Sequence, residues 1–205
     1  VLAGDEAATV QIAASGGAGI CFEAQAADTG LARRVVVTGG EMIAAAQEGR
    51  VRDALDALEV HRLLCAHRRG PFGVAQWSRR VEEWLVEGVA GFDPSQIWYP
   101  GRPLMVTQNA RDLGLFNGDT GVVVRHGDEL RAHFARGRQI HSVSPFLLDQ
   151  VQTIHAMTVH KAQGSQFDEV TVVLPPPDSP LLTQELLYTA ITRAKREVTL
   201  IGSEE

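Results

Sequence analysis

Residues 157–170, MTVHKAQGSQFDEV, combine hydroxyl, imidazole, ammonium and amide groups in one short stretch. Gly164 permits a tight backbone turn among the polar side chains, which belong to Thr158, His160, Lys161, Gln163 and Gln166. The stretch lies between two apolar runs, so we expect a loop at the edge of a strand, where polar groups can meet a ligand. A polar strand-to-loop junction with a satisfied histidine explains any one of these residues alone. Only their concentration favours a site.

Residues 183–195, TQELLYTAITRAK, are predicted to form a helix with an apolar face of Leu186, Leu187, Ala190 and Ile191. Arg193 lies near the end of this helix, where solvation or the helix dipole is enough to explain a cation. The more specific interpretation is a guanidinium directed at a transferring phosphoryl group. Its planar donor fork would stabilise the negative charge that develops there.

Hydrophobic periodicity indicates the elements that precede these two segments. Residues 41–64 have apolar residues at helical spacing around a break at Gly49, which predicts two helices. A further amphipathic helix is expected at residues 74–86. Residues 1–30 lack the periodicity of a helix or a strand and are interpreted as a remnant or linker of something larger.

The pattern of residue types along the sequence changes at about residue 97. Short β-prone runs separated by the turns PG, NGD and HGD are typical of a small all-β module. Strands are then expected at 153–164 and 168–175, followed by the helix at 183–195 and a final strand at 197–202. Segments with helix and strand patterns lie on both sides of the β module, so we expect this module to interrupt an α/β domain.

Composition narrows the class of protein. The chain has 205 residues, 44% of them hydrophobic, which is enough to bury a substantial core. No apolar run approaches the roughly 20 residues that span a bilayer, so neither membrane contact nor secretion is indicated and a cytoplasmic location is expected. Cys21 and Cys65 lie far apart outside any Cys/His cluster, which predicts neither a disulfide framework nor a metal site. The formal net charge of -6 argues against a uniformly basic surface but allows a local basic groove.

The segments at 157–170 and 183–195 together resemble motifs V and VI of superfamily-one helicases, and specifically the RecD family, the alpha subunit of exodeoxyribonuclease V. LLCAHRRGPFGVAQWS resembles the RecD segment after motif IV, and GLFNGDTGVVV resembles the inserted β module of that family. The resemblance covers about residues 58–203. It implies an α/β fold of the RecA-like, P-loop NTPase type, as the second motor domain with a small inserted SH3-like β-barrel. The implied boundaries are 31–96 and 153–205 for the RecA-like domain, and 97–152 for the insertion.

The same resemblance implies roles for individual residues. Arg193 matches the motif VI arginine that reaches the γ-phosphate, and Gln166 matches the motif V position near the nucleotide ribose. Gly164 shapes that loop, and Arg68 is a weaker candidate for a nucleotide phosphate or DNA contact. The implied DNA-binding residues are Thr158, His160, Lys161 and Gln163.

Departures from the family pattern limit what this chain can do alone. No G-x-x-x-x-G-K-[ST] sequence occurs in it, so the cradle for the β- and γ-phosphates and the Mg²⁺ hydroxyl ligand are missing. We therefore expect ATP and Mg²⁺ to be bound mainly by a preceding motor domain, and the chain alone to be inactive. Motifs III and IV stay unassigned near the N-terminus.

The leading hypothesis is the C-terminal half of a RecD-type 5′–3′ DNA helicase that moves on single-stranded DNA with RecB- and RecC-type subunits. The alternatives are a non-catalytic DNA- or partner-binding module, motivated by the missing phosphate loop, and a standalone RecD-like helicase. Four aromatic residues are candidates for stacking on DNA bases: Trp77, Trp84, Trp98 and Phe116. Core packing is the better interpretation of Trp84, and a hairpin turn is the better interpretation of Asn117 and Asp119 around Gly118.

Overall fold

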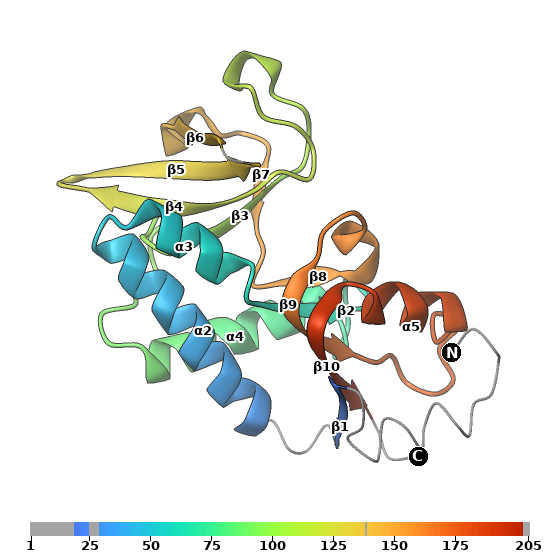
Figure 1. Cartoon of the computed structure of the whole chain (residues 1–205). Helices are drawn as coiled ribbons and strands as arrows, with labels where there is room; N and C mark the ends of the chain where they lie inside the picture. Colours follow the sequence, from blue (N-terminus) through green and yellow to red (C-terminus); the bar gives the residue numbers. More distant parts are fainter. Residues whose placement is uncertain (1–18, 25–28, 138, 203–205) are drawn as a thin grey trace. The chain divides into compact units, whose positions relative to one another are not determined.

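The computed structural model describes residues 19–24, 29–137 and 139–202 (Figure 1). The chain divides into two compact units. Of the described residues, the first unit contains 19–24, 29–33, 59–81 and 155–202, and the second contains 34–58, 82–137 and 139–154. Most of the predicted linker at 1–30 lies outside the described residues.

The first unit is built on a parallel sheet of five strands in the order β1-β10-β9-β2-β8. The strands are β1 (Ile20–Ala24), β2 (His61–Cys65), β8 (Ala156–Thr158), β9 (Phe167–Val173) and β10 (Ala194–Gly202). In β9 the run Val170 to Val173 is fully buried, which is typical of a parallel strand covered on both faces. The parallel sheet agrees with the α/β class expected from the sequence.

Connections between the parallel strands include three helical segments. The 3-10 helix η4 (Val159–Ala162) follows β8, and α5 (Gln184–Ile191) lies between β9 and β10 and contacts η4. The helix α4 (Val74–Gly88) follows β2 and confirms the helix expected at 74–86. Within α5, Thr183 caps the N-terminus by accepting a hydrogen bond from the Leu186 N–H at 3.2 Å.

Two expected helix boundaries were wrong. The helices α2 (Thr29–Gln47) and α3 (Val51–Leu58) flank Gly49 as predicted, but α2 begins well before residue 41 and α3 ends before residue 61. Residues 61–65 form the internal strand β2 instead, because four of its five residues are buried between its two neighbouring strands, β9 and β8. A short apolar run of this kind has no periodicity that separates a buried strand from a helix end. The strand β1 was also missed.

The second unit is built on an antiparallel sheet of five strands in the order β6-β5-β4-β3-β7. The strands are β3 (Pro103–Val106), β4 (Thr120–His126), β5 (Glu129–Arg136), β6 (Gln139–Val143) and β7 (Val151–Thr153). The short 3-10 helices η2 (Arg111–Leu113) and η3 (Pro145–Leu147) lie in its connections. All five strands lie between Pro103 and Thr153.

Both faces of the antiparallel sheet are packed. On one face Val122 and Val124 join apolar residues of α2 and α3, including Ala46 and Leu55, in one buried cluster. On the other face a second cluster includes Leu104, Val123, Phe134 and Val143. Alternation of the buried side chains along β4 therefore supplies two separate cores. None of the described helices is both long and apolar enough to cross a membrane.

Candidate functional site

The loop that follows β8 is shaped by a threonine cap. The hydroxyl oxygen of Thr158 accepts a hydrogen bond from the Lys161 N–H at 3.3 Å, and this closes the first turn of η4. Thr158 itself is 8% exposed. Its position is therefore that of a buried residue that holds the turn, and the turn presents the exposed His160 and the half-buried Lys161.

Arg68 lies close to Lys161. The strands β2 and β8 are parallel neighbours, and Cys65 pairs with Thr158 at their carboxyl ends. Arg68 and Lys161 each follow three residues later, so they leave the sheet at the same edge. Burial is the main cause that lowers the pKa of Lys161, and the positive charge of Arg68 lowers it further. Two cations held near each other favour an anion between or beside them.

The segment that carries Arg68 has a fixed backbone. The carbonyls of His67 and Arg68 accept hydrogen bonds from the N–H groups of Val74 and Ala75 at 3.0 and 3.2 Å. The Nε2 atom of His67 lies 3.2 Å from the hydroxyl of Ser179, after β9. A Cβ atom added to Gly73 would lie 2.4 Å from the carbonyl oxygen of Arg69. The loop can therefore adopt this shape only with glycine at position 73.

The next part of the loop runs from η4 to the start of β9. Gly164 has a φ of +89°, in the left-handed region that favours glycine, and the side chains of Gln163 and Gln166 on either side of it are exposed. The Ser165 N–H donates to the carbonyl of Ala162 at 3.1 Å. The two glutamines therefore lie on an exposed turn that leads into a buried strand.

Arg193 joins the turn at 163–166 to the end of α5. Its Nη1 donates to the carbonyl of Ser165 at 3.0 Å, and its Nε donates to the carbonyl of Thr189 at 3.1 Å. Its Nη2 donates to the hydroxyl of Thr192 at 3.2 Å. The backbone is joined as well, because the Phe167 N–H donates to the Arg193 carbonyl at 2.8 Å. The segments at 157–170 and 183–195 are thus in direct contact.

The predicted site residues fall at two ends of the parallel sheet. Thr158 is level with Cys65 and Val173 at the carboxyl ends of the strands. Phe167 pairs with Ala194 near the amino ends of β9 and β10. Arg68, Thr158, His160 and Lys161 therefore form a carboxyl-edge group, and Gln166 and Arg193 form an amino-edge group. Arg68, which was predicted with the nucleotide-binding residues, lies in the carboxyl-edge group.

The aromatic residues differ in their availability for stacking. Trp77 is 0% exposed, so its interpretation as a base platform was wrong. The ring of Trp98 is covered by the guanidinium of Arg102 at 4.5 Å and packs against the second core cluster. Phe116 is 45% exposed and is the most open of the three.

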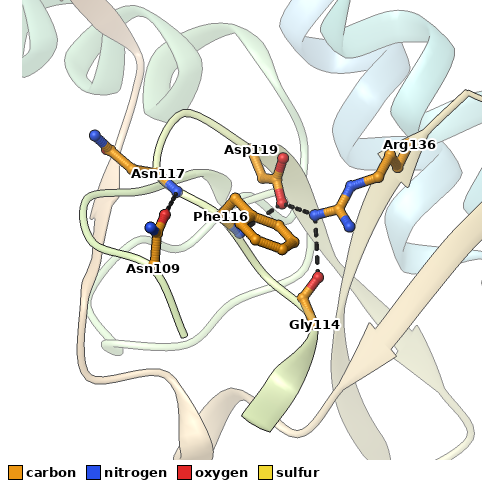
Figure 2. Close-up of polar contacts among 6 residues, drawn as sticks. All are labelled: Asn109, Gly114, Phe116, Asn117, Asp119 and Arg136. Atoms are coloured by element: carbon orange, nitrogen blue, oxygen red, sulfur yellow. Dashed lines mark hydrogen bonds and ion pairs between the residues drawn. The ribbon is translucent and has the colours of Figure 1, made fainter. Parts of the chain in front are cut away.

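Phe116 belongs to a polar cluster that joins the connection between β3 and β4 to Arg136 of β5 (Figure 2). Its ring lies 4.6 Å from the guanidinium carbon of Arg136. Asp119 accepts hydrogen bonds from the Phe116 N–H at 2.8 Å and from Arg136, which also donates to the Gly114 carbonyl at 3.0 Å. The Asn117 N–H donates to the side chain of Asn109 at 2.8 Å. These contacts fit the predicted turn around Gly118, which has a φ of +94°.

Two functional groups at the amino edge were missed from the sequence. One is the carbonyl of Ser165, and a backbone group carries no signal in a sequence. The other is the hydroxyl of Thr192, whose position next to Arg193 was visible but whose orientation was not. Among the described residues, no group of three or more His, Cys, Asp or Glu side chains could hold a metal ion.

Comparison with known proteins assigns the family. The sequence model of the UvrD-like helicase C-terminal domain matches residues 153–201. The RecBCD enzyme subunit RecD of Mycolicibacterium smegmatis is 48% identical over 207 residues, which cover 98% of this chain and 36% of that protein. The RecBCD enzyme subunit RecD of Mycobacterium tuberculosis (strain CDC 1551 / Oshkosh) is 56% identical over 151 residues, which cover 74% of this chain and 26% of that protein. The chain belongs to the RecD family.

This RecD-family chain spans about a quarter to a third of the length of the curated relatives named above. It is also 31% identical over 143 residues to the ATP-dependent RecD2 DNA helicase of Deinococcus radiodurans, which covers 69% of this chain and 20% of that protein. The part of the RecD-family chain built on the parallel sheet is a RecA-like helicase domain, and the matched region at 153–201 contains β8, β9, α5 and most of β10.

Proposed function

We propose that this chain is the C-terminal motor portion of a RecD-type, ATP-dependent 5′–3′ DNA helicase. The whole protein would couple ATP hydrolysis to movement along single-stranded DNA during recombination and the repair of double-strand breaks. The observation that carries the proposal is the position of Arg193. It lies at the end of α5 and is hydrogen-bonded at 3.0 Å to the loop that contains Gln166.

The amino-edge group would face the nucleotide. Arg193 would stabilise charge on the γ-phosphate, Gln166 would approach the ribose, and Gly164 would shape the turn between them. An arginine suits the phosphate because its planar donors match phosphate oxygens in pairs. The remainder of the full-length protein would supply the phosphate loop and the Mg²⁺ ligands, since this chain contains no phosphate-loop sequence. The chain alone would then be inactive as an ATPase.

The carboxyl-edge group would face the DNA backbone. Arg68 and Lys161 offer two positive charges at one edge of the sheet, and the side chains of His160 and Gln163 are exposed in the loop that follows β8. Thr158 would act through the turn that it caps, since its hydroxyl accepts from the Lys161 N–H. Contacts of this kind bind phosphates without reading sequence. They suit a motor that must step along any single strand.

The antiparallel sheet would be the SH3-like insertion of the family, at about residues 97–152, between the two parts of the RecA-like domain at 31–96 and 153–205. RecB- and RecC-type subunits are the proposed protein partners, because the relatives at 48 and 56% identity are named as subunits of the RecBCD enzyme. A standalone helicase is the alternative that the similarity to RecD2 supports. A cytoplasmic location belongs to the same proposal.

Replacement of Arg193 by Ala in the full-length parent protein tests the proposal. We expect the kcat of DNA-stimulated ATP hydrolysis to fall by about 10³-fold or more, as for other arginines that contact a transferring phosphoryl group. Arg196→Ala is the matched control, because Arg196 is an exposed arginine three residues away that forms ion pairs with Asp168 and Glu169. If Arg193→Ala hydrolysed ATP as fast as Arg196→Ala, the phosphate-contacting role would be wrong.

A non-catalytic binding module is the second candidate. It is favoured by one observation, which is that three donor atoms of Arg193 are already bonded within the chain. An autonomous module should bind single-stranded DNA as the isolated chain, with an affinity that falls steeply as salt rises. Absence of binding by the isolated chain, together with loss of ATP hydrolysis in Arg193→Ala, would leave only the motor interpretation.

A further inference from the structure

The three bonded donor atoms of Arg193 are not equivalent. The acceptors of Nε and Nη2 are the Thr189 carbonyl and the Thr192 hydroxyl, which both belong to the C-terminal end of α5. The acceptor of Nη1 is the Ser165 carbonyl, which belongs to the separate turn before β9. Two acceptors therefore move with the helix end that carries Arg193. The third belongs to a different segment, the turn before β9.

The hydroxyl of Thr192 is itself held in one orientation. It lies 2.9 Å from the Tyr188 carbonyl and 3.1 Å from the Thr189 carbonyl, and its single proton must point at these acceptors. A lone pair of its oxygen is then directed at the Nη2 donor of Arg193. The Thr192 N–H also donates to the Tyr188 carbonyl at 3.0 Å. The backbone and side chain of Thr192 are thus both fixed to the last turn of the helix.

We propose that Thr192 is a positioning residue for Arg193. Together with the Thr189 carbonyl it holds the plane of the guanidinium, so that Nη1 is the donor that a nucleotide phosphate oxygen takes from the Ser165 carbonyl. This inference rests on the proposed phosphate-contacting role of Arg193. It goes beyond that role by naming the donor that changes partner and the side chain that orients it.

Two acceptors at the end of α5 that hold the guanidinium of Arg193 give a physical advantage. An arginine side chain loses rotamer freedom when it is fixed on a ligand, and a guanidinium held in place beforehand loses less. When Nη1 exchanges one oxygen acceptor for another, Nε and Nη2 keep their partners. The exchange then needs a small displacement of one segment and leaves the side chain in its rotamer.

Three variants of the full-length parent protein test the inference through DNA-stimulated ATP hydrolysis. Thr192→Val keeps the branched shape but removes the hydroxyl, and Thr192→Ser keeps the hydroxyl. We expect Thr192→Val to lower kcat by about threefold to tenfold, the range for one lost hydrogen bond, with less than about a twofold change in KM for ATP. Thr192→Ser should remain within about twofold of the wild type. Arg193→Ala, measured in parallel, should lose about 10³-fold or more.

The outcomes separate this inference from the proposed function. If Arg193→Ala is inactive while Thr192→Val has the kcat of the wild type, Thr192 does not position Arg193 and the proposed function stands. A rise in KM with an unchanged kcat in Thr192→Val would overturn the inference, because the hydroxyl would then act on ground-state binding. Equal loss in Thr192→Ser and Thr192→Val would also overturn it, since the hydroxyl would not be the cause. Retained activity in Arg193→Ala would remove both ideas together.

Discussion

The two five-stranded sheets of this chain differ in where their cationic side chains lie and in which groups surround them. In the antiparallel sheet, Arg136 is bonded to Asp119 and the Gly114 carbonyl, and Arg131 donates to the Ser142 hydroxyl at 2.7 Å. These cations are satisfied by groups of the same sheet and its turns. In the parallel sheet, Arg68 and Lys161 lie in connections that leave the carboxyl edge, near enough for one charge to disfavour the other.

Strand connectivity explains this difference. Antiparallel neighbours are joined by short hairpins, so polar side chains find partners on the adjacent strand or in the turn. Parallel neighbours need long crossover connections, which return the chain to the opposite edge of the sheet. Polar residues in such connections lie beyond the ends of the strands, where no residue of a neighbouring strand is directly opposite them. Open α/β proteins bind ligands outside the carboxyl ends of the strands, which is the edge where Arg68 and Lys161 leave this sheet.

The largest effect expected in this comparison concerns a buried histidine of the antiparallel sheet. His133 in β5 is 5% exposed, its Nε2 lies 3.0 Å from Nε2 of His126, and burial lowers its pKa to about 4, with further lowering by His126 and Arg131. The unfolded chain binds a proton near the ordinary histidine pKa of about 6.5. Stability is therefore full above that value and is lost as the pH falls from about 6.5 towards 4. We expect the unfolding free energy to drop by about 1–2 kcal/mol over this window.

Urea unfolding at pH 7.5 and 4.5 measures this loss. His133→Gln should show a smaller pH dependence than the wild type, because the group that titrates only in the unfolded chain is removed. His160→Gln, in the exposed turn of the parallel sheet, is the control and should keep the dependence of the wild type. Equal dependence in all three proteins would mean that His133 is not the buried neutral group described above.

A smaller effect is expected at the carboxyl edge of the parallel sheet. The chain has two lysines, Lys161 in η4 and Lys195 at the start of β10, where Lys195 lies 3.4 Å from Asp168. In the full-length protein, Lys161→Ala should weaken single-stranded DNA binding by about threefold to tenfold and reduce the slope of log affinity against log salt by about 1. Lys195→Ala should change the slope by much less. A salt slope that both replacements alter equally would contradict a dedicated phosphate contact at Lys161.

The smallest effect is expected for the cluster of Phe116, Asp119 and Arg136. Arg136→Ala removes an exposed ion pair and the contact with the Phe116 ring, which together should lower the unfolding free energy by about 0.5–1 kcal/mol. Arg111→Ala, at an exposed arginine of η2, is the control. Thermal unfolding of both variants gives the difference. If the two variants were equally stable, the contacts of Arg136 would contribute nothing to the unfolding free energy. The ion pair of the antiparallel sheet would then not distinguish it energetically from the parallel sheet.

Much of the fold could be predicted from the sequence, because its signals are local. The break at Gly49, the helix α4 and the turn around Gly118 each follow from residue types within a few positions. The strand β2 could not be predicted, since its residues HRLLC adopt a strand only because β8 and β9 pair with it. Pairing of segments 93 residues apart along the chain, such as Leu63 with Ala156, has no local pattern.

The candidate site was predictable as a set of residues but not as two groups. The polar types at 157–170 and the arginine at 193 were visible in the sequence. Their division between two edges depends on the direction of β8 and β9, and the place of Arg68 beside Lys161 depends on the pairing of β2 with β8. The acceptor for Nη1 of Arg193 is a backbone carbonyl, which any residue at position 165 would provide.

Gly73 sets an unequal tolerance to change within the segment that carries Arg68. A side chain at position 73 would collide with the main chain of Arg69, whereas the side chains of Arg68 and Arg69 are exposed. Single substitutions of Arg68 or Arg69 should therefore change the charge of this loop without changing the course of its backbone. The course of the backbone depends on the absence of a Cβ atom at Gly73. A methyl group added there should therefore change the surface of the loop more than removal of the guanidinium group of Arg68 or Arg69.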